Sequence, residues 1–508
     1  SSPLQSVAAA KVAAGQAKNQ TSKDVYVMFK PGVYNISQTL AFTNQDGSEN
    51  QKIIYTSCEK EKAVFTGGIP VTNWSLHDAG KNIYKAYVGT SVNSRQLYIN
   101  GVRGVRARST AGLTDCTTDK TTGHTTTDIF LADYAHVSDL EMVYYEQWTN
   151  PRCGVSSINV ANNVATVVMK QPGWTYVENK GGTSATKPVY YENAYELLDE
   201  EGEWYLDRYS GYLYYKPRFF ENINTAEVVL PTLEKMITIK GSIDSPVKNI
   251  EFNNIDFKYT TWMRPSGNDG HSDAQNNHIR QQGSDKLPDG AIEVMNARNI
   301  AFENCGFSKL GITALKMTGA IQNCNVIGNE FYDISGSAVS LGEPNTGDVN
   351  VYNPTLEKYM IKNNNITNNY IHKTGVDYMS AAAISAGFPK NTNISHNEIF
   401  DAAYSGMHIG YGWATLATSA IENLKIENNY IHSVLNNKIF DGGGIYTIGA
   451  TGGTMENPNL IKGNYLKDIK NFHGALYTDE GSTFWKLSDN VVDLSGTPMW
   501  YGNGVTTK

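Results

Sequence analysis

The stretches ITNNYI (residues 366–371), ISHNEI (394–399) and IENNYI (426–431) share one pattern, in which an apolar residue is followed by two variable residues, an asparagine, another residue and a second apolar residue. Three further copies match this pattern less closely. The central asparagines of all six copies are Asn329, Asn369, Asn397, Asn429, Asn464 and Asn490. Two earlier segments keep the spacing with Ile255 or Cys305 in the central place. A motif that returns every 24 to 40 residues is typical of a solenoid whose coils carry loops of different lengths.

The fold class follows from what one repeat can build. A short strand, an inward asparagine and another short strand describe the corner of a coil, where each amide can pair with the same residue of the next coil. The six asparagines are therefore predicted to form an interior ladder. The leucine-rich alternative lacks its LxxLxL spacing and its alternating helices. We predict an all-β chain, a right-handed parallel β-helix with an inserted β-sandwich.

Three regions are predicted along the chain. Residues 1–94 contain a short N-terminal helix that would cover the exposed edge of the solenoid, followed by the first coils. In residues 95–235 the repeat disappears, and strands alternate with glycine-rich turns, which predicts an inserted β-sandwich-like domain. Residues 236–508 form the main β-helix. The chain stops 18 residues after Asn490 without an obvious polar cap, which allows for a longer natural chain.

Composition excludes several classes of function. The formal net charge of −8, without a long run of Lys or Arg, argues against nucleic acid or a membrane surface as partner, so a neutral or weakly charged partner is expected. Five scattered cysteines without a CxxC pair are expected to be buried thiols. No apolar run reaches membrane-spanning length, and no signal peptide begins at Ser1. Metal-binding and nucleotide-binding motifs are missing, so we expect neither metal nor cofactor.

A second register follows each asparagine. Because side chains alternate along a strand, Ser340, Ser385, His408, Tyr446 and Tyr477 are predicted to share the outer face of one sheet, which makes that face the candidate groove. His408, Tyr446 and Tyr477 are thus candidate sugar-binding residues.

Carboxylates lie close to this column. Asp479 falls two steps beyond Tyr477 on the same face, Glu480 falls on the opposite face, and Asp441 opens the neighbouring strand before three glycines. Side chains of adjacent coils, about 4.8 Å apart, can meet at one substrate. Asp479 is level with Ile448, however, and a straight strand would place Asp441 about 23 Å away. The pair therefore requires a bend at the glycines, which glycine permits.

Other aspartates have a structural explanation. Asp333, Asp401 and Asp468 each lie four residues after a ladder asparagine and are predicted to form turns. Asp441 breaks this spacing, so we favour function for it.

Aromatic and histidine residues complete the candidate site. Tyr411 and Trp413 could stack on sugar rings or pack a loop. His408 and His473 could hydrogen-bond sugar hydroxyls or be structural.

Four segments carry a family resemblance: PGVYNI (31–36), YSGMHIGYGW (404–413), FDGGGIYTIGATGGT (440–454) and GALYTDEGS (474–482). Together they resemble the β-helix glycoside hydrolases that include α-L-fucosidases and xylanases, β-xylosidases and lacto-N-biosidases, over most of the chain. The resemblance implies a catalytic nucleophile or base at Asp441 and an acid at Asp479 or Glu480. Outer-face register favours Asp479, whereas xylosidase-like members favour Glu480. Lacto-N-biosidase-like members use an Asp where this chain has Ser433, which argues against their mechanism.

The sequence thus predicts an exo-acting glycoside hydrolase that cleaves a terminal sugar, fucose- or xylose-type slightly favoured, from an oligosaccharide or polysaccharide. An extracellular or periplasmic location in a bacterium is expected. A polysaccharide lyase is the first alternative, but it would want Lys or Arg in the groove, and only Lys316 occupies the outer column. A non-catalytic glycan-binding β-helix protein is the second. Linkage, anomeric outcome and oligomeric state stay open.

Overall fold

The computed structural model describes residues 4–180, 186–281, 283–413, 417–435, 438–470 and 473–504. The chain forms two compact units, which are described separately. Unit 1 comprises Ser1–Thr66, Lys235–Lys258 and Lys286–Lys508, and unit 2 comprises Gly67–Glu234 and Tyr259–Asp285.

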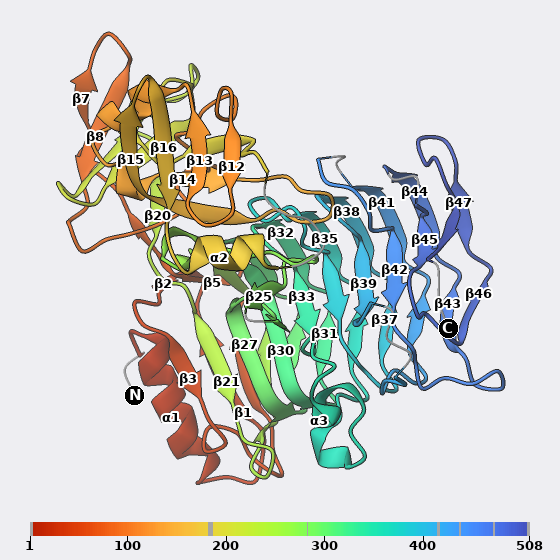
Figure 1. Ribbon diagram of the computed structural model, residues 1–508. Helices are drawn as coiled ribbons and strands as arrows, with labels where there is room; N and C mark the ends of the chain where they lie inside the picture. Colours follow the sequence, from red (N-terminus) through yellow and green to blue (C-terminus); the bar gives the residue numbers. More distant parts are fainter. Residues whose placement is uncertain are drawn as a thin grey trace. The chain divides into compact units, whose positions relative to one another are not determined.

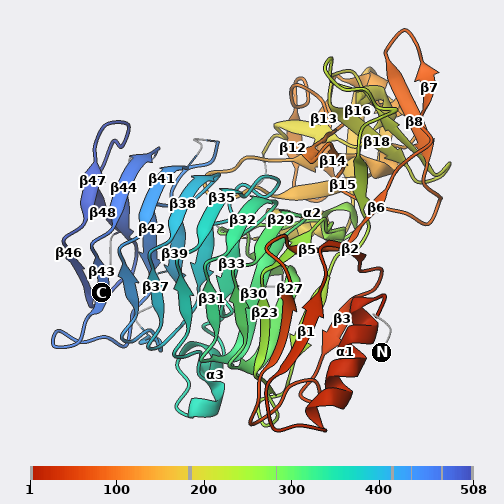
Figure 2. The same cartoon turned by 180° about the vertical axis from the view of Figure 1, so that it is seen from behind.

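Unit 1 is a parallel β-helix, as predicted, in which successive coils add strands to three long parallel sheets (Figures 1 and 2). Sheet 1 consists, in spatial order, of β1 (Val25–Phe29), β4 (Ile53–Ser57), β23 (Ile250–Asn253), β28 (Ala301–Glu303), β31 (Asn325–Ile327), β34 (Asn365–Thr367), β37 (Asn393–Ser395), β40 (Lys425–Glu427), β43 (Asn459–Lys462) and β46 (Trp485–Ser488). Sheet 2 consists of β2 (Gly32–Asn35), β5 (Ala63–Thr66), β24 (Ile255–Lys258), β29 (Gly306–Leu310), β32 (Glu330–Ile334), β35 (Tyr370–Thr374), β38 (Glu398–Ala402), β41 (Tyr430–Val434), β44 (Tyr465–Ile469) and β47 (Val491–Asp493).

Sheet 3 is the sheet that bears the candidate site. It consists of β3 (Leu40–Phe42), β21 (Ile237–Lys240), β27 (Gly290–Arg298), β30 (Thr313–Gln322), β33 (Val339–Leu341), β36 (Ile384–Ala386), β39 (Met407–Gly410), β42 (Ile445–Ile448), β45 (Leu476–Thr478) and β48 (Tyr501–Asn503), with β22 (Val247–Lys248) paired to β27. The short helix α3 (Val349–Tyr352) lies in the connection between β33 and β34.

The asparagine ladder is confirmed. Each side-chain amide donates to the amide oxygen of the next coil, as Asn369 Nδ2 does to Asn397 Oδ1 at 2.9 Å, and the same oxygen accepts the Asn369 backbone N–H at 3.0 Å. The same Nδ2 also donates to the Val326 carbonyl of the preceding coil at 2.9 Å. The pattern repeats from Asn329 to Asn490. The ladder therefore satisfies the buried polar groups at the corner between sheets 1 and 2.

The predicted turn aspartates occupy a left-handed backbone column in sheet 2. Asp333, Asp401 and Asp468 have φ values of 56°, 49° and 53°. Lys373 and Ser433, at the same place in other coils, have φ values of 54° and 52°. Pairing along sheet 2 skips this position, since the residues on either side pair with the next coil. The prediction of turns is wrong, because these aspartates lie inside β32, β38 and β44, at an irregular strand position with a left-handed backbone that Asp tolerates better than most residues.

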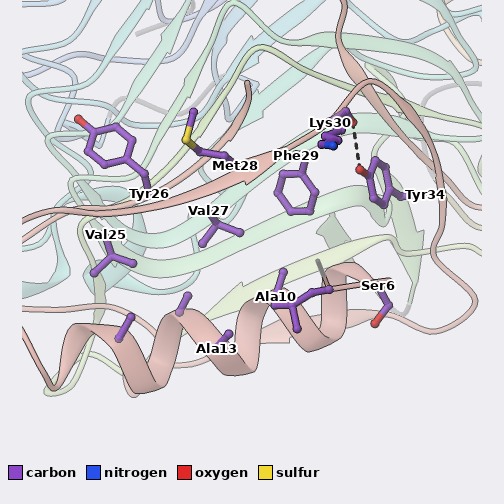
Figure 3. Close-up of a pocket in the computed structure, with 13 residues that line it drawn as sticks. Ser6, Ala10, Ala13, Val25, Tyr26, Val27, Met28, Phe29, Lys30 and Tyr34 are labelled. Carbon is purple, nitrogen blue, oxygen red and sulfur yellow. Dashed lines mark hydrogen bonds between the residues drawn. The ribbon is translucent and has the colours of Figure 1, made fainter. Parts of the chain in front are cut away.

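A helix lies at the N-terminal end of the β-helix, as predicted. Helix α1 (Val7–Lys18) begins at Ser6, whose hydroxyl accepts the Ala9 N–H at 3.2 Å. Its small side chains, Ala10 and Ala13 among them, face β1 across a cavity of about 370 Å³ (Figure 3). Lys11 ties the helix to the first coil through an ion pair with Asp46 at 2.7 Å.

Unit 2 contains three larger, mostly antiparallel sheets, the helix α2 (Gly173–Glu178) and most of a two-stranded sheet of β25 (Ile279–Gln281) and β26 (Ser284–Lys286). The larger sheets are, in spatial order, β10 (Val102–Arg103), β9 (Tyr98–Ile99), β20 (Val228–Pro231) and β6 (Gly68–Pro70); then β11 (Val105–Arg106), β18 (Glu203–Asp207), β19 (Tyr212–Tyr215), β8 (Ile83–Tyr87) and β7 (Ser75–Asp78); then β12 (Thr117–Asp119), β13 (Gly123–Thr126), β16 (Val164–Met169), β15 (Arg152–Ala161), β14 (Glu141–Val143) and β17 (Tyr190–Glu192). Two apolar cores lie among them.

The compact unit differs in its bounds from the expected insertion of residues 95–235. It begins at Gly67, because β6 pairs with β20 and β8 pairs with β19 rather than with a coil of the β-helix. It also includes Tyr259–Asp285, a second excursion between sheet 2 and sheet 3. The region boundary at residue 94 therefore falls inside unit 2.

Four of the five cysteines are buried free thiols, as expected, whereas Cys58 is exposed. Among the described residues, no helix has both the length and the apolar character needed to cross a membrane.

Candidate active site

The outer column of sheet 3 has the predicted register. Ser340 pairs with Ser385, Ser385 with His408, His408 with Tyr446, and Tyr446 with Tyr477. Their neighbours in the strands, such as Ile445 and Leu476, point into the core of the β-helix.

The column is not an open groove, which corrects the prediction. His408 is 1% exposed, Tyr446 is 0% exposed and Tyr477 is 9% exposed, and Ser340 and Ser385 are buried as well. Periodicity showed which side of the strand these residues occupy, but it does not predict how closely the side chains of neighbouring coils pack on one another, as the rings of His408 and Tyr446 do at 4.6 Å. The candidate residues with partly open side chains are instead Asp441, His473, Glu480, Tyr411 and Trp413.

Asp479 lies directly beyond the end of β45, which stops at Thr478. Its carboxylate accepts a short hydrogen bond from the Tyr446 hydroxyl on Oδ2 and a second from the Tyr477 hydroxyl on Oδ1 at 3.2 Å. Asp479 is 7% exposed. The carboxylate is therefore bracketed by two hydroxyls from adjacent strands.

Glu480 is not on a strand, so its expected place on the opposite strand face is wrong. The Ser482 N–H donates to the Asp479 carbonyl at 3.0 Å, and Gly481 has a φ of 77°. Residues 479–482 thus form a tight turn with glycine at the position that needs positive φ. β45 ends at Thr478, immediately before the two acids, so Asp479 and Glu480 have different neighbours.

The backbone changes direction before β42, with a left-handed conformation at Asp441 and Gly442 and a bend at Gly444, within the three glycines. Asp441 has a φ of 69° and Gly442 a φ of 82°. Asp441 Oδ1 accepts the Gly442 N–H at 2.8 Å. The chain then enters β42 only at Ile445, so Asp441 does not extend the line of that strand.

Electrostatics connect Asp441 with Asp479. Burial, followed by the charges of Asp479 and Asp441, raises the pKa of Tyr446 well above its usual value. Burial, followed by the charges of Asp441 and Asp479, also raises the pKa of Tyr477, and Glu480 contributes less. Both aspartates therefore act on the same two hydroxyls, which remain protonated donors in the ordinary pH range.

The other candidate residues join the same cluster. The His408 ring lies 4.6 Å from that of Tyr446, and the His473 ring stacks on Tyr477 at 5.7 Å. Trp413 packs against Tyr446 and Tyr477. Tyr411 makes an edge contact with Trp413 at 5.1 Å. All nine candidate residues from the sequence are thus linked by contact or by charge.

Several residues of the cluster were missed. Ser405 Oγ accepts the Gly443 N–H at 3.2 Å and so supports the bend, and the charge of Tyr404 acts on Tyr446. Phe440, next to Asp441, is 59% exposed. Ser405 stands in the quoted segment YSGMHIGYGW, and Phe440 opens FDGGG, but nothing in the repeat distinguished them from loop residues.

No three His, Cys, Asp or Glu side chains in the described part of the chain are grouped so as to hold a metal ion. Ser433 is exposed and belongs to the left-handed column of sheet 2.

The left-handed backbone at Gly442 gives a testable prediction. An alanine Cβ there would lie 2.5 Å from Ser405 Oγ and 3.1 Å from Leu435 Cδ2, at a φ of 82° that alanine disfavours. We expect Gly442→Ala to displace Asp441 and to lower kcat/KM about 10- to 100-fold, because small misplacements of catalytic groups are costly. The loss would be measured from initial rates of hydrolysis of a glycoside substrate by the variant and by the unmodified enzyme.

Gly15→Ala is the matched control, since a Cβ at Gly15 meets nothing within 4 Å. Circular dichroism would check that both variants fold. Full activity in a folded Gly442→Ala variant would mean that this backbone conformation does not hold Asp441 for the reaction.

Comparisons with known proteins bear on the class of this protein. A family model described as the GH141 insertion domain matches residues 84–218, inside unit 2. A solved structure described as "Glycoside hydrolase" superposes with a TM-score of 0.84 at 26% sequence identity, covering 99% of this chain and 94% of that one. Another, "The complex structure of XylC with xylose", has a TM-score of 0.45 at 10% identity and covers 92% of this chain and 66% of that one. No curated protein matches the chain.

The domain match and the full-length likeness together define the class of this protein: it is a glycoside hydrolase. Residues 84–218 are similar to the insertion domain described for GH141.

Proposed function

We propose that this glycoside hydrolase is exo-acting and uses Asp441 and Asp479 as its paired carboxylates. The observation that supports the pair is that both segments meet at the same tyrosines: Asp479 accepts hydrogen bonds from Tyr446 and Tyr477, and Gly443, two residues after Asp441, lies so near Tyr477 that an added Cβ would be 3.1 Å from Tyr477 Cβ. In such a pair one carboxyl group protonates the departing oxygen, and the other attacks the sugar or activates water.

Asp479 is favoured over Glu480 as the second carboxylate. Asp479 accepts hydrogen bonds from both tyrosines, whereas Glu480 lies in the following turn and acts on Tyr477 by charge alone. A group that must be held within a fraction of an ångström benefits from such fixed neighbours.

The exo mode is supported by burial. Ser340, Ser385 and His408 are 2%, 5% and 1% exposed, so this part of the outer column offers no open trough for the middle of a polymer. The partly open side chains gather instead near Asp441 and Asp479. This arrangement suits the end of a glycan chain.

For the substrate we propose a neutral glycan with a terminal fucose- or xylose-type sugar. The family resemblance favours these sugars, and the net charge of −8 suits an uncharged ligand better than an anionic one. Phe440 and Trp413 could stack on a sugar ring, since aromatic faces pack well against its C–H groups. Because glycans of this kind lie outside cells, we also propose an extracellular or periplasmic site of action.

The test is a panel of aryl glycosides and natural oligosaccharides with products followed by NMR. The proposal expects one monosaccharide to be released from chain ends. Release of internal fragments would contradict the exo mode, and another terminal sugar would contradict the fucose or xylose preference. The first-formed anomer would report the stereochemistry, since carboxyl groups about 5 Å apart suit retention and about 6.5–9.5 Å apart suit inversion.

A polysaccharide lyase fits less well. Lys316 lies in the outer column four strands away from Tyr446, which corresponds to about 19 Å at the usual strand spacing. Burial lowers the pKa of Lys316, and the nearest opposing charge is that of Glu293. Lys316 is therefore too distant to neutralise a uronate held between Asp441 and Asp479.

A further inference from the structure

The surroundings of Asp479 differ from those of a residue on an open sugar-binding surface. Each oxygen of its carboxylate faces a different tyrosine hydroxyl, Oδ2 that of Tyr446 and Oδ1 that of Tyr477. On one side the backbone of Gly504 comes so near that an added Cβ would lie 2.2 Å from Oδ1. The carboxylate therefore has little freedom to rotate.

The two tyrosine rings are fixed as firmly. Tyr446 and Tyr477 are paired neighbours in β42 and β45, and their rings meet edge to face at 5.2 Å. His408 packs on the Tyr446 ring, and His473 stacks on the Tyr477 ring. Each hydroxyl that donates to Asp479 thus belongs to a ring that packs against the other tyrosine and against a histidine.

The two tyrosine hydroxyls are the donors in these hydrogen bonds, because they remain protonated. Burial and the charges of Asp441 and Asp479 raise the pKa of both tyrosines, so their hydroxyls act as donors. The charged or titratable groups that act on them are Asp441, Asp479, Glu480 and Tyr404. Both hydroxyls therefore donate, and the two oxygens of Asp479 accept one hydrogen bond each.

We infer that Tyr446 and Tyr477 are positioning residues that hold both oxygens of the Asp479 carboxylate in place as hydrogen-bond acceptors, so that Asp479 is the nucleophile or base and Asp441 the acid. This inference rests on the proposed function of the pair. It reverses the roles that the family resemblance implies, and it gives Tyr446, which is 0% exposed, a role through Asp479 rather than through the sugar.

The test compares Tyr446→Phe and Tyr477→Phe with the unmodified enzyme. We expect Tyr446→Phe to lower kcat about 10- to 100-fold, in line with a hydrogen bond to a charged group, and to leave KM within about 2-fold. Tyr477→Phe, whose bond is longer, should lower kcat less. The separation of the effect on kcat from the effect on KM distinguishes a positioning role from a direct contact with the sugar.

The matched control is Tyr55→Phe, which also removes a buried tyrosine hydroxyl, but in β4 among Phe42 and Phe252. It should leave kcat unchanged. If Tyr446→Phe does not fold by circular dichroism, Tyr477→Phe answers the same question.

Failure of the inference can be distinguished from failure of the proposed function. A raised KM with unchanged kcat in Tyr446→Phe would overturn the inference and make the tyrosine a sugar contact. If Asp479→Asn is inactive while both tyrosine variants behave as wild type, the inference fails and the proposed function stands. If Asp479→Asn is fully active, the proposed function itself fails.

Discussion

Asp441→Asn and Asp479→Asn are each expected to lower kcat/KM for glycoside hydrolysis by about 10²–10⁴-fold, the usual contribution of a positioned acid or base. Asparagine keeps the size of the side chain but can neither carry a proton to the leaving oxygen nor act as a nucleophile. Initial rates on an aryl glycoside would measure the loss. Calorimetric titration with an oligosaccharide should show binding retained in both variants.

Asp401→Asn is the matched control for these two changes. Asp401 is exposed and belongs to the left-handed backbone column of sheet 2. Its φ of 49° is one that asparagine tolerates. Its rate should stay at the wild-type value. Wild-type hydrolysis in both Asp441→Asn and Asp479→Asn would place the reaction elsewhere, and binding without hydrolysis in the unmodified protein would revive the non-catalytic alternative.

Asn397→Ala is expected to destabilise unit 1 by about 3–5 kcal/mol. The Asn397 amide donates to Asn429 Oδ1 at 3.0 Å and to the Ile366 carbonyl at 2.9 Å. Its oxygen accepts the backbone N–H and the Nδ2 of Asn369 at 3.0 and 2.9 Å. Alanine would leave these buried groups without those bonds. The midpoint of urea unfolding, followed by circular dichroism, measures the effect.

Asn365→Ala is the control, because Asn365 is half-buried in sheet 1 and its amide donates one hydrogen bond, to Asn325 Oδ1 at 3.0 Å. Its cost should remain below about 1 kcal/mol. An equal loss of stability in the two variants would show that an asparagine inside the ladder stabilises unit 1 no more than one in sheet 1.

The β-helix was predictable because its repeat encodes local geometry. An asparagine between two apolar residues fixes the corner, and period-two alternation fixes which side chains share a face. The register from Ser340 to Tyr477 followed from these two rules. Spacing marked Asp333 and Asp468 as equivalent positions, but it did not show that they lie inside strands with a left-handed backbone.

How closely the side chains pack on that face was not predictable. His408 and Tyr446 are buried, and the Tyr446 ring packs on those of His408 and Tyr477, which the repeat does not encode. The start of unit 2 was missed because β6 and β8 are short strands whose partners lie more than a hundred residues later. Their sequences look like further coils until the pairing is known.

The site was predictable in part. All nine candidate residues lie in one cluster, but the hydrogen bonds that distinguish Asp479 from Glu480 depend on where β45 ends, at Thr478. A difference of one residue in a strand boundary changes which acid meets the tyrosines, and boundaries are the least certain part of any prediction from sequence. Ser405 was missed because its contact with Gly443 exists only once the bend has formed.

The most direct test of the carboxylate pair is a crystal structure of Asp441→Asn with an intact oligosaccharide bound. We predict that the terminal sugar lies between residues 441 and 479, with the glycosidic oxygen within hydrogen-bond reach, about 2.6–3.2 Å, of the residue 441 side chain and the anomeric carbon facing Asp479. An oligosaccharide that is bound with neither residue near its glycosidic oxygen or anomeric carbon would contradict the account.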